Sequence, residues 1–175
     1  MTPSLRTFSL LAALLLLAAC SPKYDWREIH TSQGQYMAAF PAKPSSETRD
    51  TQLAGKTVSM TMSSAQVDGI TFAIASATMP DAAEARAALP VLKQGLLGNI
   101  NGQLKQESVP HLGQGEGLQM EAAGSQQQHG KPQPIAIHAR FIAHKQFIYQ
   151  LVVMGPSKNI MRDSIDTFFT SFKVE

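Results

Sequence analysis

The most regular pattern of apolar and polar positions lies in residues 56–79 and predicts two strands. In the first strand the apolar positions alternate with serine and threonine: Val58, Met60 and Met62. Such alternation is typical of a strand with one buried face. Asp68-Gly69 then matches a type I′ turn, and the alternation resumes on the return strand at Ile70, Phe72 and Ile74. The segment therefore predicts an antiparallel hairpin.

A helical pattern follows Pro80. Asp81 and Glu84 have the spacing of a capping box, which satisfies backbone N–H groups at a helix start. Apolar residues then recur at spacings of three and four and form one face: Ala85, Leu89, Leu92, Leu96 and Ile100. Pro90 lies inside this pattern, so we expect a kink or a second helical start there. A terminal helix is predicted from Ser157 or Asn159 onward, because apolar residues again share one face.

The remaining segments predict further strands. Residues 147–154 are almost continuously apolar, as expected of a strand in the centre of a sheet. Shorter strands are predicted over residues 24–29, 34–40, 118–122 and 135–141, a polar loop over 125–132, and a short extended end at 171–174. Strands, a long helix, more strands and a terminal helix favour an α+β fold. We expect an antiparallel β-sheet covered by two main α-helices.

The N-terminal stretch has a different pattern. Phe8 to Ala19 is a run of mostly leucine and alanine, and Arg6 is the one charged residue before it. As a helix these residues would span about 18 Å, whereas the hydrocarbon core of a membrane is about 30 Å thick. The run is therefore too short to cross a membrane and is typical of the apolar region of a signal peptide.

The end of this run, Leu17-Ala18-Ala19-Cys20, resembles the lipobox of bacterial lipoproteins. The resemblance implies cleavage before Cys20, a diacylglyceryl thioether on its sulfur and acylation, often by palmitate, of its new amine. Two or more acyl chains give stable anchoring, so membrane lipid is the expected partner. Ser21, in place of an aspartate, implies an outer membrane location facing the periplasm. The alternative is an ordinary secretory signal with an unrelated cysteine nearby.

These patterns divide the chain into a signal peptide (1–19), a lipid anchor with a short tether (20–24) and a single α+β domain (25–175). Four extended tether residues reach only about 14 Å, so we expect the domain to lie close to the membrane surface. The net charge of +2 falls to +1 without Arg6, and no basic block is present. Nucleic acid is therefore not an expected partner. Cys20 is the only cysteine, so no disulfide is expected.

The mature chain also resembles proteins of the PsbP/Mog1-like group. The resemblance rests on the hairpin, the helix after Pro80 and two aromatic segments, Tyr36…Phe40-Pro41-x-x-Pro44 and Phe168-Phe169-x-Ser171-Phe172. It implies a PsbP/Mog1-like sandwich and a binding or assembly role rather than an enzymatic one.

Residues with catalytic or metal-binding chemistry form no recognisable motif. The histidines are scattered and include no helical pair with metal-ligand spacing: His30, His111, His129, His138 and His144. The methionines suit either copper(I) or, as we expect, irregular gaps in a core. No nucleophile elbow, phosphate loop or dinucleotide fingerprint occurs. We therefore predict no catalytic, cofactor-binding or metal-binding residues.

The sequence predicts a lipid-anchored cell-envelope protein with a non-catalytic binding or assembly role at the membrane surface, with an envelope protein as a possible partner. The alternatives are an envelope hydrolase with a site assembled from distant loops, and a carrier of a metal or small ligand. The candidate surface is the polar sheet face around His138 and Arg140 with the 125–132 loop. Tyr24 and Trp26 either pack into the core, as we expect, or rest among lipid headgroups.

Overall fold

The computed structural model describes residues 23–110, 115–128 and 130–175, and most of its elements are strands. One antiparallel sheet has seven strands, in the spatial order β3 (Ser45–Leu53), β4 (Lys56–Val67), β5 (Ile70–Thr78), β9 (Phe147–Gly155), β8 (Lys131–His144), β7 (Glu116–Gln128) and β6 (Gln103–Ser108). A small antiparallel sheet has three strands, β1 (Arg27–Thr31), β2 (Tyr36–Phe40) and β10 (Lys173–Val174).

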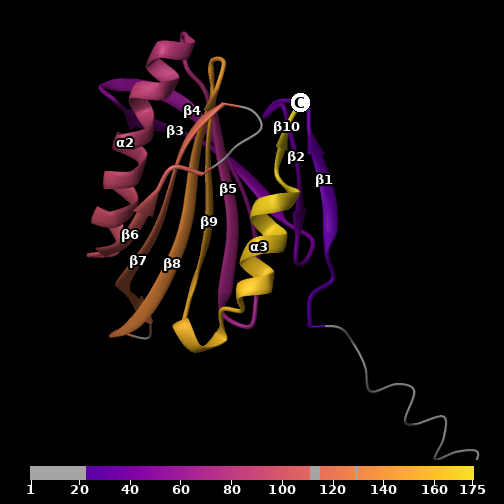
Figure 1. Cartoon of the computed structure of the whole chain (residues 1–175), viewed down its shortest axis with the longest axis vertical. Coiled ribbons are helices and arrows are strands. Elements are labelled where there is room, and N and C mark those ends of the chain that lie inside the picture. The colour runs from indigo at the N-terminus through magenta and orange to yellow at the C-terminus, as the bar shows by residue number, and fades with distance from the viewer. Residues whose placement is uncertain (1–22, 111–114, 129) are drawn as a thin grey trace, which may run out of the picture.

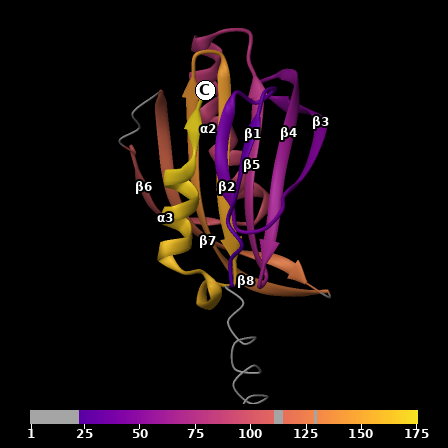
Figure 2. The ribbon, with the colours of Figure 1, turned by 90° about the vertical axis from the view of Figure 1, so that its right-hand side faces the viewer.

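The two faces of the large sheet are covered by different elements. Helix α2 (Ala82–Asn99) packs on one face, across β7, β8 and β9 (Figure 1). The small sheet and helix α3 (Arg162–Ser171) lie on the opposite face (Figure 2). A 3₁₀ turn, η1 (Ser157–Asn159), leads from β9 to α3. Within the described residues, neither helix is long and apolar enough to cross a membrane.

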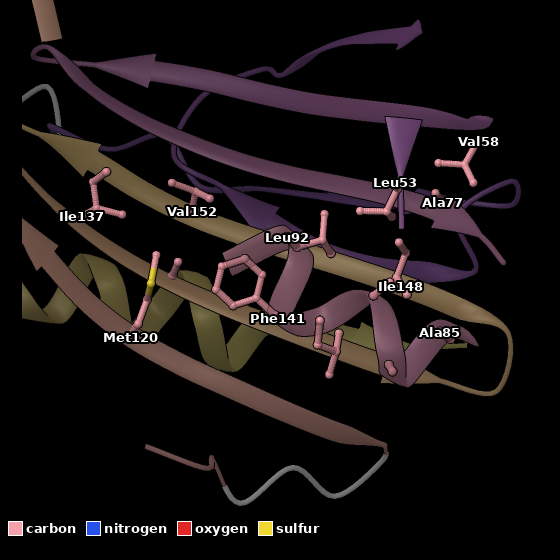
Figure 3. Packing of buried hydrophobic residues seen from close by; sticks show 14 of the residues in the cluster. Leu53, Val58, Ala77, Ala85, Leu92, Met120, Ile137, Phe141, Ile148 and Val152 are labelled. Atoms are coloured by element: carbon pink, nitrogen blue, oxygen red, sulfur yellow. The ribbon is translucent and has the colours of Figure 1, made fainter. Parts of the chain in front are cut away.

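An apolar core fills the space between α2 and the large sheet (Figure 3). Phe141 of β8 is fully buried there, with Ala85 and Leu92 from the helix. Each large side chain buried in this way contributes about 1.5–3 kcal/mol. The Asp81 carboxylate caps the helix by accepting hydrogen bonds from the backbone N–H groups of Ala83 and Glu84, both at 2.8 Å.

A second core, rich in aromatic rings, lies on the opposite face. The Phe168 ring of α3 contacts Phe40 of β2 and Phe72 of β5, with centroids 5.4 Å apart in both pairs and edge-to-face geometry. Tyr36 and Tyr149 form a further edge-to-face pair at 5.8 Å. Such pairs contribute about 0.5–1.5 kcal/mol beyond the area that they bury. They fix the small sheet and α3 onto the large sheet.

The predicted fold class, an antiparallel sheet covered by two helices in a PsbP/Mog1-like sandwich, is wrong. The described chain is mostly strand, with two sheets and two α-helices, and a second sheet shares the covering of one face with α3. The error has a physical cause. β10 has two residues and joins β2 from more than 130 residues away, so local periodicity carries no sign of this sheet.

Several predicted elements are confirmed. The hairpin of β4 and β5 turns at Asp68 and Gly69, whose φ angles of 51° and 75° suit a type I′ turn. β9 is central in the large sheet. Helix α2 runs through Pro90 as one element, so no second helical start occurs within it. The predicted 125–132 loop is wrong, because β7 extends to Gln128 and β8 begins at Lys131.

Candidate functional site

A cleft of about 590 Å³ lies where the small sheet ends and leaves part of the large sheet uncovered. The turn between β1 and β2 forms one side, and strands β3, β4 and β5 form the floor. Most of its lining side chains carry a hydroxyl group: Thr31, Ser32, Tyr36, Ser46, Thr48, Ser59, Thr61, Ser63, Ser76 and Thr78. His30, Gln33, Gly34, Ala77 and Phe147 complete the lining.

The floor of the cleft follows from strand alternation and register. Every second residue of a strand points to the same face, so Ser59, Thr61 and Ser63 share the cleft face of β4. The register sets Ser46 of β3 opposite Ser63 and Thr48 opposite Thr61. The paired hydroxyl oxygens lie 2.7 Å and 2.8 Å apart, respectively, so both pairs are hydrogen-bonded. The floor is a ladder of hydroxyl groups held by the sheet.

The inner end of the cleft meets the aromatic core. The Tyr36 hydroxyl donates to Ser63 Oγ at 3.4 Å, and burial raises the pKa of this phenol above its usual 10.0. Ser63 is itself only 1% exposed. Both hydroxyl groups therefore stay protonated at physiological pH and act in this network as neutral hydrogen-bonding groups.

Tyr149 of β9 fixes the turn that overhangs the cleft. Its buried hydroxyl donates to the Gly34 carbonyl oxygen at 2.9 Å, and burial raises the pKa of Tyr149. Gly34 has no room for a side chain, since a Cβ atom there would lie 2.6 Å from the Tyr36 ring. The centre of the large sheet thus sets the position of the β1–β2 turn.

His30 lies at the rim of the cleft with both ring nitrogens occupied. Nδ1 lies 2.9 Å from a Glu175 carboxylate oxygen, and Nε2 lies 3.2 Å from one of Glu28. These hydrogen bonds, the one with Glu175 first, raise the pKa of His30 above 6.5. Both nitrogens are donors only in the protonated imidazole. His30 therefore favours its protonated form more than a free histidine does, and both of its nitrogens already have carboxylate partners.

Ser76 differs from its neighbours in the floor. The residue is only 6% exposed and lines the cleft, but its oxygen is not a buried atom without a partner; in the described residues that holds for the Tyr24 hydroxyl. A hydroxyl group at the wall of a cleft is hydrated in the free protein and can exchange this water for a ligand group. The Ser76 hydroxyl is thus available to a molecule in the cleft.

The cleft has no charged side chain in its lining apart from His30. It also lacks a set of metal ligands: over the described ranges, no three His, Cys, Asp or Glu side chains group together. What the arrangement offers chemically is a dense set of hydroxyl groups, each of which donates one hydrogen bond and accepts up to two. Hydrogen-bonded recognition is a chemistry that these groups support.

The surface predicted around His138 and Arg140 is largely engaged within the protein. Arg140 donates to Gln119 Oε1 and to the Phe169 carbonyl oxygen, and its guanidinium lies 4.7 Å from the Phe169 ring centroid. His138 Nδ1 lies 3.5 Å from Glu121, and burial lowers its pKa. Helix α3 therefore covers the residues that were expected to form a free polar face.

The other predicted residues divide between the core and undescribed segments. Tyr24 and Trp26 both pack against Phe72, with ring centroids at 6.1 Å, as the core interpretation predicts. Four methionines fill the core between α2 and the large sheet, as predicted: Met60, Met79, Met120 and Met154. For Met62 and Met161 the core prediction is wrong, because both side chains are exposed. Cys20 and the signal peptide, like His111 and His129, lie outside the described residues.

The sequence does not reveal the cleft, because β3, which forms part of its floor, has no alternation of apolar and polar residues. Every residue from Ser45 to Gln52 is exposed, so the segment resembles a loop. One signal was present. On β5 the same face carries Ile70, Phe72 and Ile74 and then changes to Ser76 and Thr78. Such a change along one face of a strand indicates where the elements that pack on that face end.

Comparisons with known proteins give only weak structural likenesses. No protein-family model and no curated protein matches the chain. Among solved structures the chain is similar to LpqN, described as involved in cell envelope biogenesis of Mycobacterium tuberculosis, with 20% identity and a TM-score of 0.41. The likeness covers 89% of this chain and 80% of that one. Because such a TM-score does not establish a shared fold, the role of LpqN is not carried over to this chain.

Proposed function

We propose that this chain is a lipid-anchored cell-envelope protein with a non-catalytic binding role, and that it binds its ligand in the hydroxyl-lined cleft. The observation that carries the binding role is the cleft itself, with a volume of about 590 Å³ and a lining in which most side chains carry a hydroxyl group. A ligand in the cleft exchanges hydrogen bonds with water for hydrogen bonds with these groups.

The geometry at His30 supports binding rather than hydrolysis. A hydrolase that uses a serine nucleophile needs an imidazole nitrogen free to take the serine proton. His30 is the histidine that lines the cleft, and Glu28 and Glu175 hold both of its nitrogens. The serines of the cleft therefore have no activating base in His30.

The anchor in this proposal is Cys20, acylated as the lipobox resemblance implies, in an outer membrane facing the periplasm. Lys23, three residues later, forms an ion pair with Asp68 in the β4–β5 turn, with Nζ and Oδ2 3.3 Å apart. Three extended residues reach about 11 Å. The turn at Asp68 would therefore lie close to the membrane surface.

A Cys20→Ser variant tests the anchor. Cells expressing the wild-type chain or the variant are labelled with radioactive palmitate and fractionated, and the outer and inner membranes are separated on a sucrose gradient. We expect the wild-type chain to be labelled and to be found with the outer membrane. The variant should be unlabelled and soluble in the periplasm. Membrane retention of the unlabelled variant would show that another feature attaches the protein.

The fold of the Cys20→Ser chain, which the binding experiments use, is checked separately. Its circular dichroism spectrum and its midpoint of urea unfolding should match those of a matched Ser21→Ala control chain. If the variant unfolds, Cys20 has a structural role that the proposal does not include.

A further inference from the structure

We infer that the cleft takes an uncharged, polyhydroxylated chain, which is the chemistry of a neutral oligosaccharide. This inference rests on the proposed function, because it assumes that the cleft is the binding site. Three properties of the cleft indicate this ligand class: its hydroxyl groups, its charge and its open side.

The hydroxyl groups match a ligand that both donates and accepts hydrogen bonds. Serine and threonine offer one donor and two acceptor lone pairs each, and a sugar hydroxyl offers the same set. The backbone of the floor is already paired within the sheet, between β3 and β4 and between β4 and β5. An extended peptide lying over β4 would therefore find side chains rather than the unpaired backbone groups that peptide addition to a sheet uses.

The charge around the cleft disfavours an anionic ligand. His30 is the one side chain in the lining that can carry a positive charge, and Glu28 and Glu175 already pair with it. Asp50 lies next along the same face of β3, opposite Ser59. A phosphate or carboxylate would meet carboxylates at the rim without an unpaired cation to bind it. A neutral ligand avoids this cost.

The apolar part of the lining suits a sugar as well. Phe147 is half-buried and stacks on Tyr149, with centroids 6.4 Å apart and ring planes 22° from parallel. The Phe147 ring thus gives the cleft an apolar surface beside the hydroxyl ladder. Sugars present C–H groups and hydroxyl groups on adjacent parts of one ring, so both parts of the lining find a partner.

The open side of the cleft suits a chain rather than a single sugar. β3 is an edge strand of the large sheet, and Ser46 and Thr48 are exposed. The volume of about 590 Å³ lies in the range of ligand sites in proteins, roughly 300–1,000 Å³. A chain bound over β4 and β5 can continue past β3 into solvent.

The test uses the Cys20→Ser chain and four tetrasaccharides that differ in charge. Maltotetraose and N-acetylated chitotetraose are neutral, tetraglucosamine is cationic and tetragalacturonate is anionic. Binding is followed through backbone amide chemical shifts, with an octapeptide of alternating glycine and serine as the peptide probe. We expect at least one neutral tetrasaccharide to shift the amides of residues 30–36, 46–48, 59–63 and 76–78 and to bind more tightly than either charged one.

Two variants then test the hydroxyl groups of the floor. Ser76→Ala and Thr61→Val should each weaken binding of the neutral tetrasaccharide about threefold to tenfold, the loss expected for one hydrogen bond. Thr71→Val is the matched control, since Thr71 also lies on β5 but outside the cleft lining. It should leave the affinity unchanged.

Three results would overturn the ligand class: no neutral tetrasaccharide shifts the cleft amides, a charged one binds more tightly, or the peptide binds in their place. Peptide or charged-sugar binding in the cleft would overturn the inference and leave the binding role intact. Binding of a neutral tetrasaccharide elsewhere on the protein would overturn both. The anchor is tested independently, so its failure is distinguishable from either result.

Discussion

Strands β4 and β5 present two faces with opposite chemistry over the same stretch of sheet. On the face toward α2, Val58 belongs to the apolar core. On the other face, Thr61 and Ser76 line the cleft with hydroxyl groups. The first face is covered by a helix, and the second extends beyond the end of its cover. This part of the sheet is therefore stabilised by packing on one face, and its other face is free for recognition.

The largest test of this comparison removes one phenylalanine from each region. Phe141→Ala in the core under α2 should lower the free energy of unfolding by about 3–5 kcal/mol. Phe147→Ala in the cleft should lower it by about 1 kcal/mol, because a half-buried ring loses less buried area. Urea denaturation at constant pH measures both. Equal losses would show that the cleft contributes to stability as a core does.

A smaller effect is expected from exchanging valine and threonine across β4. Val58→Thr places a hydroxyl group in the apolar core and should cost about 1–3 kcal/mol of stability. Thr61→Val, on the opposite face, loses only the exposed hydrogen bond to Thr48 and should change stability by about 0.5 kcal/mol or less. Thermal unfolding of the two variants gives the comparison directly. A large loss for Thr61→Val would mean that the hydroxyl ladder is structural.

The smallest effect concerns pH at the cleft rim. The carboxylates raise the pKa of His30 in the folded chain, so folding favours its protonated form. The resulting stabilisation is fully present below the unfolded pKa of about 6.5 and is lost as pH rises through the folded pKa. Glu175→Gln should therefore bring the NMR titration of His30 closer to 6.5 and reduce the loss of stability between pH 5 and pH 8. Unchanged titration would mean that Glu175 does not hold His30 in solution.

Local patterns predicted the elements in which one short segment contains all the necessary information. Asp68-Gly69 sets the β4–β5 turn, and Asp81 caps the helix that follows. The wholly polar β3 was missed, because an edge strand with almost every side chain exposed has no apolar alternation to find. β7 and β8 extend several residues beyond the segments that have an apolar pattern, because their polar ends pair only with each other.

The cleft could not be predicted, because it depends on contacts between distant segments. The hydroxyl alternation of Ser59, Thr61 and Ser63 was visible, but an exposed strand face has the same pattern. Only the turn held by Tyr149, more than 110 residues from Gly34, converts that face into the side of a cleft. The hydrogen bond between His30 and Glu175 likewise joins residues that are 145 positions apart in the sequence.

The ion pair between Lys23 and Asp68 sets the distance between the N-terminal end of the domain and the cleft. Asp68 follows the last residue of β4, and Thr61 in the middle of the cleft lies seven residues earlier in the chain, a distance of about 23 Å at 3.3 Å per residue. If Cys20 is acylated as proposed, its lipid would be held near the opposite end of the strand from the cleft. The hairpin would then act as a rigid spacer, which presents the cleft to polymers beyond the lipid headgroups instead of to the headgroups themselves.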